Sequence, residues 1–232
     1  MKKTTKIIIN TLFIIFMTYP LAYSGTWTDE FNDNLLNPKW TGDRDNFFVA
    51  DGYLQGRNAN PILLLPLKWV EIGKDWDNYI VSCKINVVMP NLLICTKGAL
   101  VLRRNGNEGY VFALHTATKT VEVYRLSDGE ILLTKNKDLQ LEKWYKVKAE
   151  LKADDMSFYV DDELIGTVKD KRSMTGSVGL AVQDALSVLF DDFSITGPKI
   201  DDGSANVKIN DKISTTWAKI KYGGTDGDRI RR

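Results

Sequence analysis

The sequence has few of the residues that build metal sites and activated nucleophiles. Its 232 residues include one histidine and two cysteines. No His/Cys group has the spacing of a zinc site, and we find no serine-centred elbow, phosphate-binding loop or dinucleotide fingerprint in the sequence. These absences argue against zinc enzymes, elbow-type serine hydrolases and enzymes that bind nucleotides through such loops.

An excess of either charge is also missing. Lysine and arginine number 31, aspartate and glutamate number 30, and the formal net charge is +1. Proteins that bind nucleic acid or anionic lipid usually carry a clear basic excess. We therefore expect neither a nucleic-acid partner nor an anionic membrane surface.

Long apolar runs are absent except at the N-terminus. Three lysines in the first six residues precede a largely apolar run over 7–21, and residues 22–24 place Ala and Ser at the −3 and −1 positions of a cut before Gly25. This pattern predicts a signal peptide over 1–24 and export to the periplasm, cell surface or medium. The alternative is a membrane anchor, but the run is interrupted and shorter than the about 20 residues of a span. No later stretch is long enough, so we expect no transmembrane segment after cleavage.

Helical stripes are absent from residues 25–198. Turn signals recur there about every 8–12 residues, as in an all-β sandwich or barrel. Asp51-Gly52, Asp128-Gly129 and Asp161-Asp162 lie between β-prone runs and predict hairpins.

Apolar periodicity supports the same fold class. Residues 147–152 alternate between apolar and charged side chains, which predicts a half-buried strand, whereas 110–114 is apolar on both faces and predicts a central strand covered twice. Residues 177–182 and 187–195 complete the set of strands. We predict one all-β domain over 25–198.

The composition changes after Pro198. Residues 200–210 are rich in Asp, Gly, Ser and Asn, and Trp217 follows among lysines and threonines. We predict a partly disordered C-terminal tail over 199–232 with one short ordered piece. The alternative is disorder throughout.

The two cysteines fit an oxidising compartment. Cys83 and Cys95 are equidistant from Met89, which stands beside Pro90 at a plausible chain reversal. If the chain folds back there, the two sulfurs oppose each other and form a disulfide. The alternative is two small buried hydrophobic side chains.

Several motifs, in order, resemble concanavalin A-like lectin/glucanase domains. The opening is Trp27-Thr28-Asp29-Glu30-Phe31 followed by Leu36, Pro38 and Trp40. Residues 98–103 and 109–112 resemble the central strand pair of the laminin G-like and three-keto-disaccharide hydrolase-like members. The other matching stretches are 49–54, 144–148, 159–161, 176–180 and 190–193. The resemblance implies a jelly-roll sandwich of two antiparallel sheets, one of them curved, with a concave face that often holds saccharide.

The opening also resembles family sixteen glycoside hydrolases, whose two Glu flank an Asp at alternate positions of one strand. Retaining hydrolysis needs two carboxyl groups about 5–5.5 Å apart. The nearest match here is Glu150 and Asp154, with Lys152 between them, so the hydrolase pattern is missing. His115 has no recognisable acidic partner in the sequence, and we expect it to be a solvated strand-end histidine. The sequence therefore favours a protein without catalytic residues.

The resemblance also implies a structural calcium ion near the place where the first and last strands meet. Asp192, with Asp29 or the carbonyl of Gly52, would supply oxygen ligands for Ca²⁺. The alternative is ordinary surface carboxylates.

Aromatic side chains are the sequence's best candidates for sugar contacts, because sugar C–H faces stack on aromatic rings. Trp27, Trp40 and Trp144 match framework positions and are expected in the core. The candidate ligand-binding residues are Trp69, Trp76, Arg103, Tyr124 and Arg125. For the two arginines the alternative is an ordinary solvated strand position.

Three functions remain open from the sequence. The first is an exported, non-catalytic recognition domain that binds a glycan or a cell-envelope partner. The second is an enzyme acting on glycosidic bonds through Glu71, Asp75 or Glu122. The third is a structural or adhesive envelope protein that docks through its tail.

Overall fold

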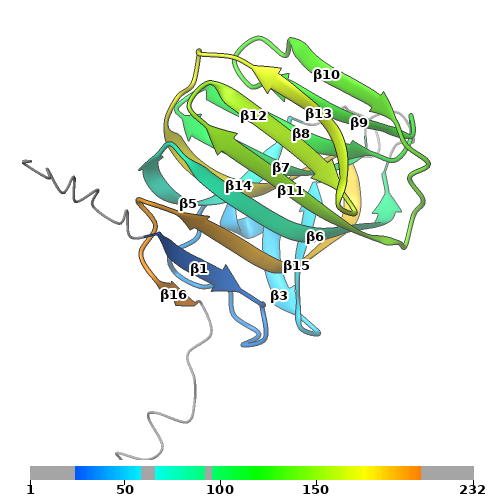
Figure 1. Ribbon diagram of the computed structural model, residues 1–232. Coiled ribbons are helices and arrows are strands. Elements are labelled where there is room, and N and C mark those ends of the chain that lie inside the picture. Colours follow the sequence, from blue (N-terminus) through cyan, green and yellow to red (C-terminus); the bar gives the residue numbers. More distant parts are fainter. Residues whose placement is uncertain (1–23, 59–65, 92–95, 205–232) are drawn as a thin grey trace, which may run out of the picture.

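The computed structural model describes residues 24–58, 66–91 and 96–204, which form two β-sheets packed face to face (Figure 1). The predicted all-β sandwich is confirmed, because the only helix among these residues is a 3-10 turn, η1, at Arg44–Asn46. Every strand pairing is antiparallel except that of β1 with β16. No helix in the described part of the chain has the length and apolarity of a membrane span.

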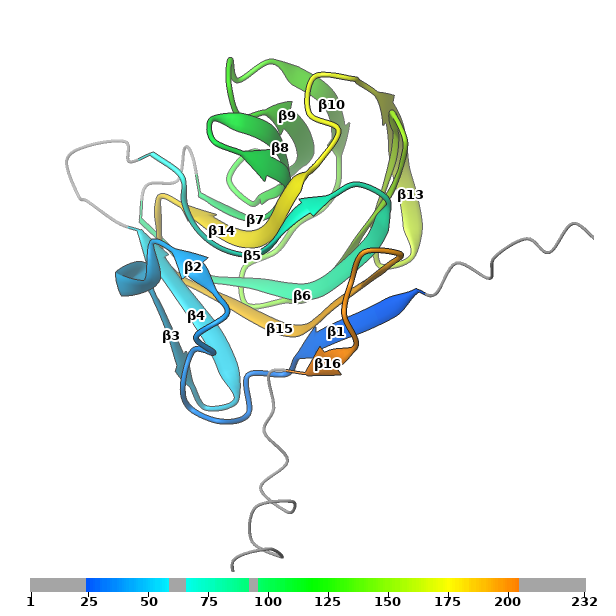
Figure 2. The same cartoon turned by 90° about the vertical axis from the view of Figure 1, so that its left-hand side faces the viewer.

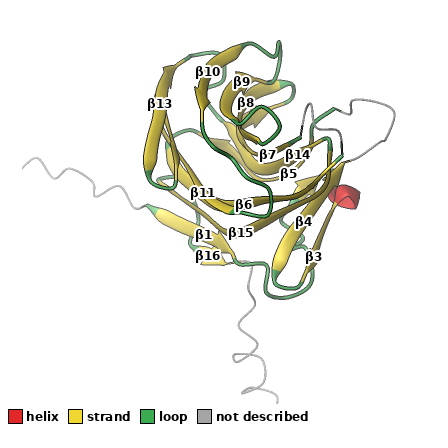
Figure 3. Ribbon diagram, turned by 90° about the vertical axis from the view of Figure 1, so that its right-hand side faces the viewer, coloured by secondary structure: helices red, strands yellow, loops and turns green. Residues whose placement is uncertain are grey.

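The back sheet has the strand order β13-β12-β11-β6-β15-β1-β16, and β4 joins it beside β15 and pairs with β3 (Figure 3). Its strands are β1 (Gly25–Asp29), β3 (Phe47–Ala50), β4 (Tyr53–Asn58), β6 (Tyr79–Pro90), β11 (Trp144–Lys152), β12 (Asp155–Val160), β13 (Glu163–Lys169), β15 (Ala185–Gly197) and β16 (Gly203–Ser204). The front sheet has the order β10-β9-β8-β7-β14-β5-β2. Its strands are β2 (Thr41–Gly42), β5 (Lys68–Trp76), β7 (Lys97–Asn105), β8 (Glu108–His115), β9 (Thr120–Arg125), β10 (Ile131–Asn136) and β14 (Gly176–Gln183).

All three predicted hairpins are present. Asp51 and Gly52 join β3 to β4, and both have positive φ (54° and 79°), as a type I′ turn requires. Asp161 and Asp162 do the same between β12 and β13 (φ 51° and 63°). Aspartate tolerates this backbone region because its short side chain bonds locally. The turn between β9 and β10 contains Gly129 at φ 70°.

The main core lies between the two sheets. Trp40 packs edge to face against Phe193 and Trp27, with ring centroids 5.0 and 5.7 Å apart. Trp27 and Trp40 are buried, as predicted. Trp144 is not in the core: it is half-buried and packs against Tyr53, with ring centroids 5.3 Å apart. The framework resemblance therefore placed two of its three tryptophans correctly.

The chain does not form a hairpin at Pro90. β6 pairs with β11 and β15 in the back sheet, whereas β7 belongs to the front sheet. Cys83 is a buried free thiol whose Sγ donates to the carbonyl oxygens of Lys84 and Asp191 (3.1 and 3.2 Å). Burial raises the pKa of this thiol. The chain reversal on which the predicted disulfide depended is therefore wrong, and Cys95 lies outside the described residues.

Residues beyond Pro198 take part in the back sheet. β16 pairs with β1, and the Asp202 carboxylate accepts the backbone N–H of Thr26 at 2.7 Å. The first residues of the predicted tail are therefore ordered. The rest of the tail, including Trp217, and the predicted signal peptide up to residue 23 lie outside the described residues.

Candidate functional site

The outer face of the front sheet, turned away from the back sheet, has a floor of small apolar side chains. Ala99, Val101, Val111, Ala113 and Ala181 form a cluster on it and are fully buried. The predicted double covering of β8 is thus confirmed, because seven of its eight residues are buried. Figure 2 shows how strongly the sheet curves from β5 to β10. Small residues suit the inside of such a curve, where side chains converge.

Strand register arranges this face in two rows that cross five strands. The first row runs Trp69, Ala181, Ala99, Ala113, Glu122, from β5 to β9. The second runs Glu71, Gly179, Val101, Val111, Tyr124 over the same strands. Each row therefore has an aromatic residue at one end and a glutamate at the other. In the first row the aromatic residue is on β5, and in the second row it is on β9. The large side chains that cover the floor are Leu67, Trp69, Tyr124 and Leu126.

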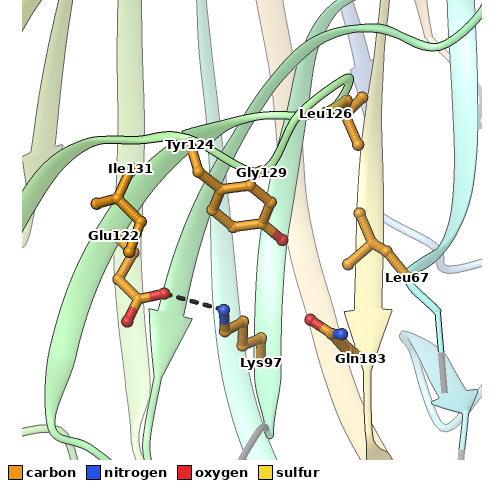
Figure 4. Close-up of a pocket in the computed structure, with 8 residues that line it drawn as sticks. All are labelled: Leu67, Lys97, Glu122, Tyr124, Leu126, Gly129, Ile131 and Gln183. Atoms are coloured by element: carbon orange, nitrogen blue, oxygen red, sulfur yellow. Dashed lines mark ion pairs between the residues drawn. The ribbon is translucent and has the colours of Figure 1, made fainter. Parts of the chain in front are cut away.

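Around Tyr124 of β9 the face holds a cavity of about 340 Å³, whose lining reaches Gln183 of β14 and Leu67 just before β5 (Figure 4). The Tyr124 ring forms its centre, and its hydroxyl points toward Gln183 and Leu67. Lys97 Nζ lies 4.9 Å from the centroid of this ring and 2.9 Å from Glu122 Oε2. An apolar cavity with a few convergent polar groups is the usual form of a small-ligand site.

Glu122 is held by three donors at this end. Besides Lys97, His115 Nδ1 lies 3.1 Å and Thr120 Oγ1 3.0 Å from Glu122 Oε1. The hydrogen bond with His115, and next the one from Lys97, lowers the pKa of Glu122 to about 2 against the opposing effect of burial. Glu122 is therefore an ionised hydrogen-bond acceptor at neutral pH.

The expectation of a solvated His115 without an acidic partner is wrong. His115 is buried and faces Glu122 from the neighbouring strand. The pairing of β8 with β9 brings the two together, and no sequence motif marks it.

The β5 end of the face also combines a glutamate, a cation and an aromatic ring. Arg104 Nη1 lies 2.6 Å from Glu71 Oε1, and Ser177 Oγ donates to Glu71 Oε2 at 2.5 Å. The Arg104 guanidinium carbon lies 4.4 Å from the centroid of the Trp69 ring. A hollow of about 200 Å³ adjoins this group, and Asp75 lines it together with Glu71.

The two glutamates of this face are far apart. Glu71 is on β5 and Glu122 on β9, and the four strand spacings between them, about 4.8 Å each, amount to roughly 19 Å measured along the sheet. Retaining glycosidases place their carboxyls about 5–5.5 Å apart and inverting ones about 6.5–9.5 Å. Glu71 and Glu122 also line separate hollows, so they do not form a hydrolytic pair.

Two of the five predicted ligand-binding residues, Trp69 and Tyr124, lie on this face. Trp76 does not: it packs against the main core and lines a different hollow with Trp27 and Lys39. That hollow has a volume of about 290 Å³ and lies at the end of β5. Trp76 is therefore separate from the candidate site.

Arg103 is the clearest correction. It is fully buried, and its Nε and Nη2 donate to the carbonyl oxygen of Asp77 (3.0 and 2.6 Å). A β-bulge between Leu102 and Asn105, with Arg103 at φ 47°, breaks the alternation of β7. As a result Arg104, not Arg103, reaches the outer face.

Arg125 also points away from the candidate site. It is buried and forms ion pairs with Asp170, at 3.0 Å, and with Asp128 and Glu130. Consecutive strand residues face opposite sides of a sheet, so Tyr124 and Arg125 cannot both line one face. This error was avoidable from the sequence.

One of the residues proposed for calcium, Asp29, points away from the other two. Asp29 faces the core, where its Oδ1 accepts the Phe31 N–H (2.9 Å) and its Oδ2 the Trp40 Nε1–H (2.8 Å). The pairing of β1 with β15 places Asp29 opposite Phe193, so its side chain follows that buried face.

Asp192 and Gly52 border another hollow, and Asp192 Oδ2 lies 2.6 Å from Lys84 Nζ. Within the described ranges no three His, Cys, Asp or Glu side chains are arranged to hold a metal ion. Asp29 is therefore wrong as a predicted calcium ligand, whereas the alternative of Asp192 with the Gly52 carbonyl stays a prediction.

The burial of Asp29 predicts a pH effect on stability. Burial, against the hydrogen bond from Trp40, raises the pKa of Asp29 from 3.8 to about 6. A folded-state pKa above the unfolded value means that ionisation costs stability: the cost is absent below about pH 4 and complete above about pH 6. Its upper limit is about 3 kcal/mol, from 1.36 kcal/mol per unit of pKa.

Chemical denaturation of the wild type and Asp29→Asn between pH 4 and 7 measures this cost. We expect the difference in unfolding free energy to shift in favour of the variant as the pH rises through this range. A difference independent of pH would contradict the buried-carboxylate account.

Comparison with known proteins identifies the fold only. No family model matches this sequence, and no curated protein matches it. The carbohydrate-binding module CBM66 from Bacillus subtilis is similar in structure, with a TM-score of 0.59 and 19% identity over 67% of this chain and 94% of that one.

Two further solved structures share the fold. A xylan beta-1,4-xylosidase from Bacillus halodurans matches with a TM-score of 0.56 and 18% identity, over 72% of this chain and 38% of that one. A protein of unknown function with a galectin-like fold from Bacillus subtilis matches with a TM-score of 0.51 and 11% identity, over 70% of this chain and 93% of that one. At these identities the similarity shows a shared β-sandwich.

Proposed function

We propose that this protein is an exported recognition domain of the concanavalin A-like superfamily, and that the outer face of its front sheet binds carbohydrate without cleaving it. The observation that carries the proposal is the cavity around Tyr124. An aromatic ring stands there beside a cationic donor, Lys97, and an ionised acceptor, Glu122. A sugar needs this combination, because its C–H face stacks on a ring while its hydroxyls both donate and accept.

The donor and acceptor are also suitably spaced for a sugar. Lys97 Nζ and Glu122 Oε2 are 2.9 Å apart, close to the separation of two hydroxyl oxygens on neighbouring ring carbons. One hydroxyl can accept from the ammonium while its neighbour donates to the carboxylate. The proteins of similar fold include a carbohydrate-binding module and a xylosidase, which supports a carbohydrate ligand of this kind.

Affinity electrophoresis tests the proposal. The chain from Gly25 onward is run through gels containing xylan, β-glucan, inulin or polygalacturonate. We expect retardation by at least one neutral polysaccharide. Unchanged mobility in every gel, together with no retention on insoluble polysaccharides, would favour a protein partner of the cell envelope instead.

A glycosidic enzyme is the second candidate. It is favoured by one observation, that Glu71 and Asp75 line the same hollow. Both oxygens of Glu71, however, are engaged by Arg104 and Ser177. We expect no release of reducing sugar from any retained polysaccharide and no turnover of aryl glycosides or 3-keto-glycosides. A rate that disappears in Glu71→Gln or Asp75→Asn would overturn the non-catalytic proposal.

A further inference from the structure

The two ends of the front face are chemically equivalent under a local two-fold rotation about the middle of β7. The rotation exchanges Trp69 with Tyr124 and Glu71 with Glu122, because the two rows run in opposite order. The basic partners are exchanged too, since Lys97 and Arg104 lie at opposite ends of the same strand. Each end therefore holds one aromatic ring, one glutamate and one cation.

The contacts within the two groups match as well. At the β9 end the cation lies 4.9 Å from the ring centroid and 2.9 Å from the carboxylate. At the β5 end the corresponding distances are 4.4 and 2.6 Å. Both glutamate side chains are largely buried, with 12% and 14% exposed. The two groups thus offer a ligand the same set of ring surface, donor and acceptor.

We propose that this face has two equivalent half-sites and that its ligand is a neutral, linear oligosaccharide long enough to occupy both. This inference rests on the proposed carbohydrate-binding function and adds the class of ligand. The half-site of Tyr124, Lys97 and Glu122 is called the β9 half-site, and that of Trp69, Arg104 and Glu71 the β5 half-site.

The length follows from the sheet. The rings and glutamates of the two half-sites are four strand spacings apart, roughly 19 Å measured along the sheet, which is several sugar units. The floor between them consists of fully buried small side chains, and Leu67 and Leu126 cover it together with the two rings, so a ligand that crosses the strands runs over an apolar surface. A repeating polymer presents the same hydroxyl pattern at intervals, as two equivalent half-sites require.

The neutrality follows from the charges. Lys97 is matched by Glu122 and Arg104 by Glu71, each within 3 Å. An acidic polysaccharide would bring carboxylates beside the buried Glu122 and Glu71, and like charges at such distances repel. Neutral hydroxyls avoid this cost, so a neutral polymer is favoured over a uronate-rich or sulfated one.

Two linked half-sites predict that affinity depends on ligand length. Once one half-site is occupied, binding at the second is intramolecular, so a spanning ligand gains affinity without any new kind of contact. Titration calorimetry is carried out with oligosaccharides, from dimer to octamer, of the neutral polysaccharide that retards the protein most. We expect affinity to rise at least about tenfold once the oligomer spans both half-sites.

The matched variants are Trp69→Leu and Tyr124→Leu, which keep an apolar cover on the floor but remove one ring each; a thermal melt verifies folding. For the longest oligomer, we expect each variant to bind at least about tenfold more weakly than the wild type. For the dimer, we expect only a small loss in either variant, because the other half-site remains. Ser177→Ala, which removes one donor from Glu71, is a milder second test of the β5 half-site.

The outcomes separate this inference from the proposed function. Length-independent affinity, with Tyr124→Leu weakened and Trp69→Leu unchanged, would overturn the two half-sites and leave carbohydrate binding at the β9 end intact. Stronger retention by polygalacturonate than by every neutral polymer would overturn the neutral ligand. No retention by any polysaccharide would overturn both proposals together.

Discussion

Gly179→Val is expected to destabilise the protein by more than about 4 kcal/mol and to prevent folding at moderate temperature. Gly179 lies in the floor of the front face, on β14 between β5 and β7. A Cβ at this position would stand 2.2 Å from the carbonyl oxygen of Val70 and 3.0 Å from the Glu71 Cβ. Because the first contact is with backbone of the adjacent strand, the pairing of β14 with β5 has to break to relieve it.

The control is Gly106→Asn. Gly106 has φ 61°, and a Cβ there meets no atom within 4 Å. Asparagine tolerates this backbone region, so we expect a loss below about 1 kcal/mol. Urea unfolding of both variants measures the difference. Wild-type-like stability of Gly179→Val would show that the front sheet is less tightly curved than described.

Tyr124→Ala is expected to weaken binding of a retained polysaccharide by at least about tenfold, equivalent to 1.4 kcal/mol. The ring forms the centre of the β9 cavity and lies beside Lys97 (Figure 4). Truncation removes the stacking surface and leaves Lys97 and Glu122 without an aromatic ring beside them to orient a sugar. The loss should appear as reduced retardation in affinity gels.

Trp144→Ala is the matched control for this variant. Trp144 is a half-buried aromatic of the back sheet that packs on Tyr53, away from the front face. Its removal should leave retardation unchanged within about twofold. Equal losses in the two variants would indicate a general effect on folding, and a loss in Trp144→Ala alone would move the site to the back sheet.

Local rules were sufficient to predict most of the strands and turns. The alternation at 147–152 and the Asp-Gly pair at 51–52 depend only on neighbouring residues, and both predictions are confirmed by β11 and by the β3–β4 hairpin. The double covering of β8 followed from its composition. Such features are set by side-chain periodicity and backbone preference, which a single sequence contains.

The candidate site was only partly predictable, because it depends on register between strands distant in sequence. Glu71 and Tyr124 share a row although 52 residues separate them along the chain. The β-bulge at Arg103 brought Arg104 to the face, and its positive φ leaves no mark in a simple alternation pattern. Trp69 was found because it is an aromatic residue outside the shared framework, and Tyr124 because its strand was expected to line the concave sheet.

The pairing of His115 with Glu122 illustrates the same limit. Six residues separate them, and only the alignment of β8 with β9 brings the two side chains within 3.1 Å. The predicted calcium site of Asp192 and Asp29 failed for a different reason. The two residues are near each other in the fold, but the Asp29 side chain points into the core. Both predictions were wrong because the direction of a side chain, which the residue type alone does not give, determines its partners.

The most direct test of a carbohydrate site on the front face is amide NMR with the retained oligosaccharide. Titration should shift the resonances of Trp69, Lys97, Glu122 and Tyr124, with those of β11 and β12 on the back sheet unchanged. Shifts confined to the back sheet, or to loops away from β5, β7 and β9, would contradict this account.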